Sequence, residues 1–295
     1  MFDARDRATK RRRDLPKQKP EDVTLRARLE SWIEQRYGDW EIEAFEHLDL
    51  TVYLRDTARF DIPLAERLRL LAVAVEARAL GGPPRRSWAI LDRIYSKALH
   101  DAPDHAWVHA SRGISASELA AMSEGGEAER LNAIARRELL HARALAPQDA
   151  QIAYCLGYVL YMDRESSIEE ALTWFDCALS ISSTHPWARL YRAHCLHDLE
   201  RWQEAAQAYA LVPPQPFMGP ASWRMDLATE QQAWCLLRAG DIAGARQKFE
   251  MILARYEKEP GLWERSHYLE SAATEFFPDL LERVTEGRQA WEAKE

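Results

Sequence analysis

Small and aromatic residues recur at helical spacing along most of the chain, and the recurrence is itself repeated. An alanine is followed four residues later by an aromatic residue and, three residues after that, by a small or aliphatic one. This triplet occurs at Ala171-Phe175-Ala178, Ala205-Tyr209-Val212 and Ala245-Phe249-Ile252, with looser copies at Leu91-Tyr95-Ala98 and Ala135-Leu139-Ala142. Residues four and three positions apart share one face of an α-helix. The pattern therefore predicts a series of helices that present the same packing ridge.

Another helix is expected before each ridge from residue 106 onward. These upstream segments carry a small residue where two helix backbones would cross, namely Gly113, Gly157, Ala193 and Ala233. Pro103 and Pro147 follow two of the ridges by five residues. Proline ends a helix because it lacks a backbone donor and restricts the residue before it. The repeating unit is therefore predicted to be a pair of helices.

This unit resembles the tetratricopeptide repeat, which has 34 residues in two helices and the pattern W-x2-L-G-x2-Y, then A-x3-F, then P. The likeness is strongest over 150–185, which reads Ala153-x2-Leu156-Gly157-x2-Leu160 before the ridge that starts at Ala171. Counted from the family's first position, units begin at Ala106, Ala150, Pro186, Asp226 and Pro260. The spacings of 44, 36, 40 and 34 residues place ten, two and six extra residues in the turns at 123–126, 164–166 and 213–220.

The resemblance implies an all-α fold, a right-handed superhelix (α-solenoid) of helix–turn–helix repeats with helical caps. We expect a disordered basic tail at 1–20, an N-terminal capping segment at 21–62, a repeat array of about five helix pairs at 63–260 and a C-terminal helical cap at 261–295. The family's tryptophan at the fourth position occurs only at Trp263, in the last, incomplete unit.

The N-terminal part fits the repeat less closely. Residues 63–103 predict a degenerate helix pair with a break at 81–84, where the sequence is Gly-Gly-Pro-Pro. Within the N-terminal cap, a helix over 21–37 would place Leu25, Leu29, Trp32 and Ile33 on one face. The segment 48–54 alternates in part and fits either a short strand or another helix.

The resemblance also implies where a partner would bind. In the family, positions 2, 5, 9 and 12 of each first helix line the concave face. We therefore expect partner contacts from Trp107, Ile114, Tyr154, Tyr158, Tyr161, Trp187, Leu190, His194, His197, Glu230, Trp234 and Leu237. This lining is rich in aromatic residues, which dominate binding hot spots. The alternative is that these rings pack against the tail, the caps or neighbouring helices. The Lys/Asn/Arg clamp with which some relatives hold a C-terminal carboxylate is missing from positions 5 and 9.

The net charge of −8 is unevenly distributed. Residues 1–20 hold eight Lys or Arg and three Asp, so the remainder carries about −13. An acidic body is a poor general nucleic-acid binder, because that affinity depends on neutralising phosphates. Only the tail, through Lys10, Arg11, Arg12 and Arg13, could contact nucleic acid or an acidic partner. The alternatives are that it is a solvated leader or folds back on the acidic body.

Cysteine usage and hydropathy indicate a cytoplasmic location. Cys155, Cys177, Cys195 and Cys235 form no C-x2-C pair and lie in predicted helices, where small reduced thiols fit best. The sequence has no apolar run of 18 residues for a membrane span, and its N-terminus has no apolar core of a secretory signal. We therefore expect no membrane partner.

Catalytic and metal patterns are missing from the sequence. It has no G-x-S-x-G elbow, no phosphate-binding loop and no dinucleotide glycine pattern. His105 with His109, and His194 with His197, have helical spacing but no further ligands in a zinc-like arrangement. We therefore expect a protein that is not an enzyme and has neither a metal nor another cofactor.

Two functional hypotheses follow. The first is a scaffold, adaptor or dedicated chaperone that binds an apolar, aromatic-containing segment of another protein in the concave groove. The second is a regulatory protein whose tail contacts nucleic acid or an acidic partner while the repeats bind protein. The oligomeric state is left open. So is a possible role of the 213–220 loop, which carries Phe217 and Met218, as a lid over the groove.

Overall fold

The computed structural model describes residues 20–79, 84–163, 166–218 and 222–293, and within these ranges all regular structure is helical. The all-α prediction is therefore confirmed for the described residues. The chain divides into two compact units, one up to Ser166 and one from Ser167 onward. The tail residues Lys10, Arg11, Arg12 and Arg13 lie outside the described ranges.

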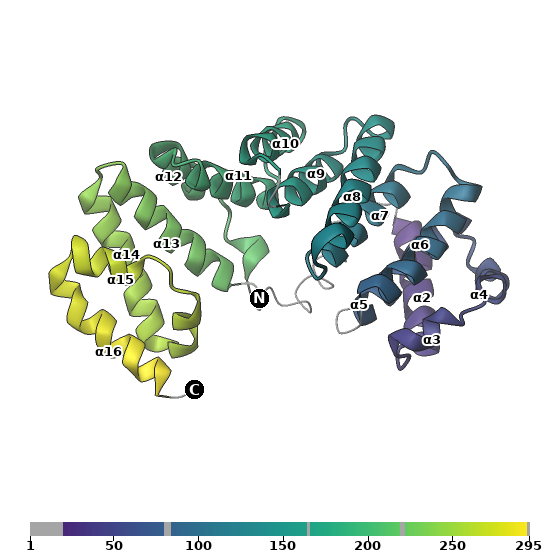
Figure 1. Ribbon diagram of the computed structural model, residues 1–295, viewed down its shortest axis with the longest axis horizontal. Helices are drawn as coiled ribbons and strands as arrows, with labels where there is room; N and C mark the ends of the chain where they lie inside the picture. The colour runs from purple at the N-terminus through teal and green to yellow at the C-terminus, as the bar shows by residue number, and fades with distance from the viewer. Residues whose placement is uncertain (1–19, 80–83, 164–165, 219–221, 294–295) are drawn as a thin grey trace. The chain divides into compact units, whose positions relative to one another are not determined.

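The first unit contains the N-terminal cap, two helix pairs and the first helix of a third (Figure 1). Its elements are α2 (Pro20–Tyr37), α3 (Ile42–Glu46), α4 (Leu50–Thr57), the 3-10 turn η1 (Ala58–Phe60), α5 (Leu64–Ala79), α6 (Pro84–Asp101), α7 (Ala106–Ala120), α8 (Gly125–Leu145) and α9 (Ala150–Met162). The α5–α6 and α7–α8 pairs pack together, and the first helices α5, α7 and α9 also adjoin. The segment 48–54 is helical, which decides between the two structures left open for it.

The second unit continues the alternation and ends in the C-terminal cap. Its elements are α10 (Ile168–Ile181), α11 (Pro186–Asp198), α12 (Trp202–Ala210), η2 (Gln215–Phe217), α13 (Trp223–Arg238), α14 (Ile242–Lys258), η4 (Pro260–Arg265), α15 (Leu269–Glu275), η5 (Pro278–Leu280) and α16 (Leu281–Glu292). Successive helices from α10 to α14 pack pairwise, and the first helices α11 and α13 adjoin. The expected first helix at Pro260 is instead the short 3-10 segment η4.

Side-chain caps set where the first helices begin. Asp149 accepts hydrogen bonds from the backbone N–H groups of Gln151 and Ile152 at the start of α9. Two histidines cap helices in the same way. Nδ1 of His105 accepts a hydrogen bond from the Val108 N–H at the start of α7, and Nδ1 of His185 accepts one from the Ala188 N–H at the start of α11. Such caps satisfy donors that have no partner within the helix.

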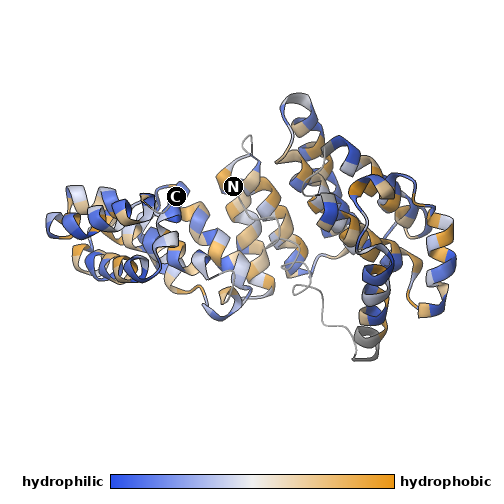
Figure 2. Cartoon of the chain, turned by 90° about the horizontal axis from the view of Figure 1, so that it is seen from below, coloured by the Kyte–Doolittle hydropathy of each residue, from blue (hydrophilic) through white to orange (hydrophobic). Residues whose placement is uncertain are grey.

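The predicted ridges form the packing core. All fifteen residues of the five triplets are buried, from Leu91-Tyr95-Ala98 to Ala245-Phe249-Ile252. Figure 2 shows the hydrophobic positions gathered along the helix faces that meet neighbouring helices. Gly113 lies at the crossing of α7 and α8, where an added Cβ would be 2.8 Å from Leu139 Cγ and 2.9 Å from the Ala135 carbonyl oxygen. The small residue is therefore required by the close approach of the two helices.

The sequence predicts a long turn for the ten extra residues of the unit that begins at Ala106, but the described residues there form no such turn. Helix α7 has 15 residues and α8 has 21, and only four residues, 121–124, separate them. The turn-forming Gly125 and Gly126 belong to the first turn of α8, which begins at Gly125. Gly125 has a positive φ of 56° at this entry to the helix. The insertion therefore lengthens the helices.

Candidate functional site

The residues expected to line the concave face differ in how far they reach solvent. In the first unit, Trp107, Ile114, Tyr158 and Tyr161 are half-buried and Tyr154 is buried. The Tyr154 and Tyr158 rings lie 6.1 Å apart on α9. In the second unit His194 and Trp234 are half-buried, whereas the other predicted contacts are buried: Trp187, Leu190, His197, Glu230 and Leu237.

Four rings gather where α11 and α13 end, and we call His197, Trp202, Trp234 and Tyr268 the aromatic cluster. Trp234 of α13 stacks on Tyr268, with 4.9 Å between ring centroids and an interplanar angle of 19°. His197 of α11 lies 5.5 Å from the Tyr268 ring and 5.6 Å from the Trp202 ring. Burial raises the pKa of Tyr268 to about 12, so its hydroxyl remains neutral. The first-helix face thus brings rings from four different segments together.

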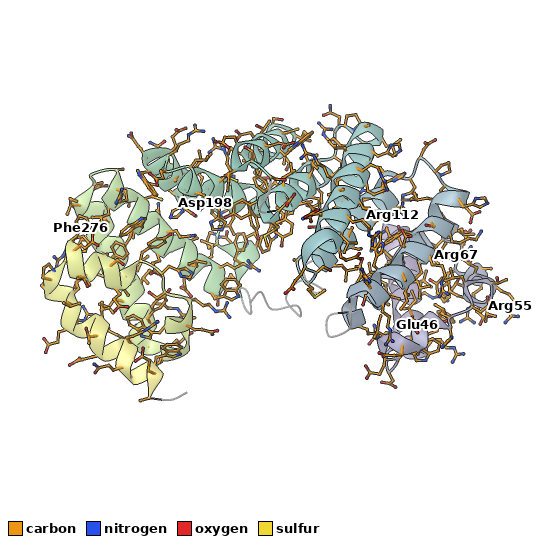
Figure 3. The ribbon with its side chains drawn as sticks, viewed as in Figure 1. Glu46, Arg55, Arg67, Arg112, Asp198 and Phe276 are labelled. Atoms are coloured by element: carbon orange, nitrogen blue, oxygen red, sulfur yellow. The ribbon has the colours of Figure 1, made fainter. Side chains whose placement is uncertain are left out.

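Polar groups border the aromatic cluster. The Arg238 guanidinium carbon lies 5.4 Å from the Trp202 ring and 5.9 Å from the Trp234 ring, within cation–π range. Nδ1 of His197 lies 3.1 Å from a carboxylate oxygen of Asp198, the last residue of α11 (Figure 3). Rings with both an apolar body and nearby charged groups suit the binding of a peptide segment.

A second group of rings lies where α11 and α13 begin, and we call Trp187, Arg224, Trp223 and Arg265 the arginine–tryptophan ladder. The Arg224 guanidinium carbon lies 5.2 Å from the Trp187 ring and 4.4 Å from the Trp223 ring. The guanidinium carbon of Arg265, from η4, lies 4.3 Å from the same Trp223 ring. Guanidinium groups and indoles thus alternate along this end of the face.

The 213–220 loop is attached beside the ladder. Phe217 is fully buried, and its ring meets that of Trp187 edge to face at 4.6 Å, whereas Met218 is exposed. Of this loop, 219–220 lies outside the described residues. Phe217 therefore holds the described part of the loop against α11 through core packing.

His194 lies on α11 between the arginine–tryptophan ladder and the aromatic cluster, and it is part of a chain of hydrogen bonds there. Tyr209 donates to Oε1 of Gln231 at 3.1 Å, so the Tyr209 oxygen accepts from Nδ1 of His194 at 2.8 Å. Burial lowers the pKa of His194 to about 4. The charges of His197 and Arg224 also lower it, and the charge of Asp198 and a hydrogen bond with Gln231 oppose the shift. The imidazole is therefore neutral at physiological pH.

We expect the His194 imidazole to make stability depend on pH. His194 binds a proton near pH 6.5 in the unfolded chain but only near pH 4 in the folded chain. Its contribution is therefore fully present above pH 6.5 and is lost as the pH falls towards 4, at a cost of about 2 kcal/mol between pH 7 and pH 5. Urea unfolding at both pH values measures this loss. His194→Gln should remove most of it, and an equal loss in this variant would contradict the assignment.

Glu230, expected to contact a partner, is fully buried and has a different role. Its Oε1 accepts from the backbone N–H groups of His267, Tyr268 and Leu269 at 2.9, 2.7 and 2.9 Å, and from Oγ of Ser266 at 3.0 Å. Tyr256 donates its hydroxyl to Oε2 at 3.1 Å. The carboxylate thus fixes the start of α15 and holds Tyr268 in the aromatic cluster. The family's groove position predicts on which face of α13 Glu230 lies, but it does not predict these internal hydrogen-bond partners.

His109, of the other histidine pair with helical spacing, also has internal partners. Nδ1 of His109 lies 2.7 Å from Glu138 Oε2, and its Nε2 lies 2.8 Å from the Pro103 carbonyl oxygen. Arg112 pairs with the same Glu138 and with Asp92 (Figure 3). Burial would raise the pKa of Glu138, but hydrogen bonds from His109 and Arg137 and the charge of Arg112 hold it below its usual range. This charged group stabilises the α7–α8 pair.

Other kinds of site are not found in the described part of the chain. There, no three His, Cys, Asp or Glu side chains gather as ligands for a metal ion. None of the helices in the described ranges has the length and apolarity needed to span a membrane. Sequence reasoning missed Trp202, Trp223, Arg224 and Arg265, which lie before or between the family's groove positions, and it also missed Tyr268, which is at position 9 of the incomplete unit that begins at Pro260. The sequence signal for Trp202 and Trp223 was composition, because tryptophan is frequent in this chain.

Comparisons with known proteins concern the fold. No family model and no curated protein matches the chain. Among solved structures, PilF of Pseudomonas aeruginosa is 19% identical to this chain and matches it with a TM-score of 0.52. The match covers 82% of this chain and 96% of the PilF chain. YrrB, described as a TPR protein with an unusual peptide-binding site, is 17% identical, with coverages of 78% and 99% and a TM-score of 0.49. PilW, described as a widely conserved type IV pilus biogenesis factor, is 18% identical, with coverages of 76% and 99% and a TM-score of 0.48.

Proposed function

We propose that this chain, whose fold is that of the tetratricopeptide repeat, is a non-enzymatic protein-interaction protein. Its first helices bind an apolar, aromatic-containing segment of another protein, and it acts in the cytoplasm as a scaffold, adaptor or dedicated chaperone. The observation that carries this proposal is the aromatic cluster, in which Trp234 and Tyr268 are stacked yet still partly exposed. Fold alone does not give function, so the proposal rests on this surface.

The geometry of the aromatic cluster favours a peptide as its ligand. Partly exposed tryptophan and tyrosine supply large, rigid contact areas at a small entropic cost. In the first unit, Tyr158 and Tyr161 of α9, with Trp107 of α7, provide a second set of half-buried rings. An extended or helical segment bound to either set would make contacts at intervals along its length.

Two further observations fit this reading. All four cysteines are free thiols, and Cys155, Cys195 and Cys235 are buried, as expected for a protein of a reducing compartment. The described body is acidic, which disfavours direct nucleic-acid binding by the repeats. The regulatory alternative depends on the basic tail and stays a prediction.

We predict that Trp234→Ala and Tyr158→Ala each weaken partner binding without unfolding the chain. Removing a central aromatic contact costs about 2 kcal/mol or more of binding free energy, or roughly thirtyfold in affinity. The test is affinity capture from the native host with wild type and each variant, followed by titration of the captured protein by calorimetry. Circular dichroism melting establishes that each variant is folded.

Phe276→Ala is the matched control. Phe276 is an exposed ring of the second unit, but it follows α15 and lies outside the aromatic cluster (Figure 3). Its removal should leave binding unchanged. Equal losses in Phe276→Ala and Trp234→Ala would contradict a specific surface, and early melting of Trp234→Ala and Tyr158→Ala would show that these rings belong to the core.

A further inference from the structure

Arg265 of the arginine–tryptophan ladder has a positive charge that is not paired with a carboxylate among the described residues. Among the described residues, Arg265 makes no hydrogen bond and no ion pair, although it is only partly exposed. Its guanidinium contacts the Trp223 ring, and a cation–π contact replaces only part of the hydration that a charge loses on burial. Arg265 therefore has donors available to a ligand.

A second cation lies beside the same ring. The guanidinium carbons of Arg224 and Arg265 lie 4.4 and 4.3 Å from the centroid of the same indole. The two charges are therefore closer together than the Debye length of roughly 10 Å at 0.1 M salt, so solvent ions screen their repulsion incompletely. An anion beside Trp223 would relieve this repulsion.

Another arginine of the same unit shows how the chain neutralises such a charge. Arg246 also lies over a ring, 5.7 Å from the Phe277 centroid, but it pairs with Glu250 and with Asp279. No comparable carboxylate is paired with Arg265 in the described ranges. A ligand carboxylate would have at Arg265 the place that Glu250 and Asp279 have at Arg246.

We propose that the arginine–tryptophan ladder recognises a carboxylate of the partner segment, an aspartate or glutamate side chain that neighbours an apolar or aromatic residue. The carboxylate accepts hydrogen bonds from the Arg265 guanidinium, whose planar donors match two oxygens. The neighbouring apolar residue lies against Trp223 or Trp187. This inference rests on the proposed function, and it adds the charge and the order of the partner's residues.

A carboxylate fits this surface better than a nucleic acid does. Arginine interleaved with indoles is also a platform on which bases stack. However, a polyphosphate strand must lie along a chain whose residues beyond position 20 carry about −13, and its affinity depends on neutralising many phosphates. A single carboxylate needs only the local charge of the ladder.

Selection from a phage library of random short peptides tests the proposal, with full-length wild type and Arg265→Gln as baits. Wild type should enrich sequences with Asp or Glu beside an aromatic or aliphatic residue, and Arg265→Gln should lose the acidic preference. A selected peptide, remade with Asn or Gln in place of its acid, should bind wild type about tenfold more weakly. It should bind Arg265→Gln with no such difference.

Three other outcomes are decisive. Apolar peptides enriched without an acidic preference would overturn the carboxylate site and leave the proposed function standing. Failure to enrich any peptide would overturn both. Binding of a single-stranded oligonucleotide that Arg265→Gln abolishes, with no acidic peptides selected, would assign the ladder to nucleic acid instead.

Two variants separate charge from structure. Arg265→Lys keeps the charge and should retain part of the acidic preference, whereas Arg246→Gln removes an arginine already paired with carboxylates and should leave it unchanged. If Arg246→Gln abolishes the preference as Arg265→Gln does, the effect comes from net charge and the assignment fails.

Discussion

Replacing Glu230 by alanine is expected to lower the free energy of unfolding of the second unit by about 3–5 kcal/mol, because buried donors would lose a charged acceptor. Three backbone N–H groups and the hydroxyls of Ser266 and Tyr256 converge on this carboxylate. Alanine offers none of them a partner. Urea unfolding followed by tryptophan fluorescence measures the loss.

The loss should begin in the C-terminal cap. The N–H groups that Glu230 accepts from precede and open α15, so limited proteolysis of Glu230→Ala should cut between α14 and α16 faster than in wild type. Glu230→Gln keeps the volume but turns an amide N–H₂ towards some of these donors, and it should also destabilise. Exposed Glu264, replaced by Gln, is the control and should change little. Wild-type stability in Glu230→Ala would rule out this anchoring role.

The repeat was predictable because its signal is local. Ridge residues such as Ala171, Phe175 and Ala178 are spaced within one helix, and all are buried as the spacing predicts. The helix pair on either side of the expected break was also predicted, with α5 ending at Ala79 and α6 beginning at Pro84, while 81–83 of that break lie outside the described residues. Helical periodicity needs no knowledge of distant contacts, so a single sequence is sufficient for it.

The role of Glu230 was not predictable because its partners are distant in sequence. Four of the five lie 36 to 39 residues away, in a segment that the spacing assigned to a new repeat. A glutamate on a first helix is interpreted as a groove residue unless the segment from Ser266 to Leu269, after η4, is known to fold back onto it. The ladder was missed for a related reason: α13 begins at Trp223, three residues before the family's start at Asp226, and Arg265 comes from the cap.

The insertion at the unit that begins at Ala106 shows a different limit. Its Gly-Gly sequence is typical of a turn, yet the two glycines begin a helix of 21 residues. Gly125 provides the positive φ at the start of α8, and the longer helix then buries Leu131 as fully as the ridge residue Leu139. Burial of apolar surface here outweighs the local preference of glycine for turns.

Trp263→Ala is expected to destabilise the second unit by about 3–5 kcal/mol, because it removes a fully buried ring from the C-terminal core. Trp263 meets the Tyr256 ring edge to face at 5.4 Å and packs against Gly287 of α16. An added Cβ at Gly287 would lie 2.5 Å from Cζ2 of Trp263. Chemical denaturation of the single variants and the double variant measures how the two positions depend on each other.

The effect of Gly287→Ala on the free energy of unfolding should change sign when Trp263 is replaced by alanine. In wild type, Gly287→Ala should destabilise by roughly 1–3 kcal/mol, since the new methyl group overlaps the indole. In Trp263→Ala the indole is gone, so Gly287→Ala should stabilise α16 by up to about 1 kcal/mol through helix propensity. Equal effects in both backgrounds would show that the indole does not require glycine at position 287. A reversal would establish that the family's tryptophan, displaced here into the cap, holds the last helix by direct contact with its backbone.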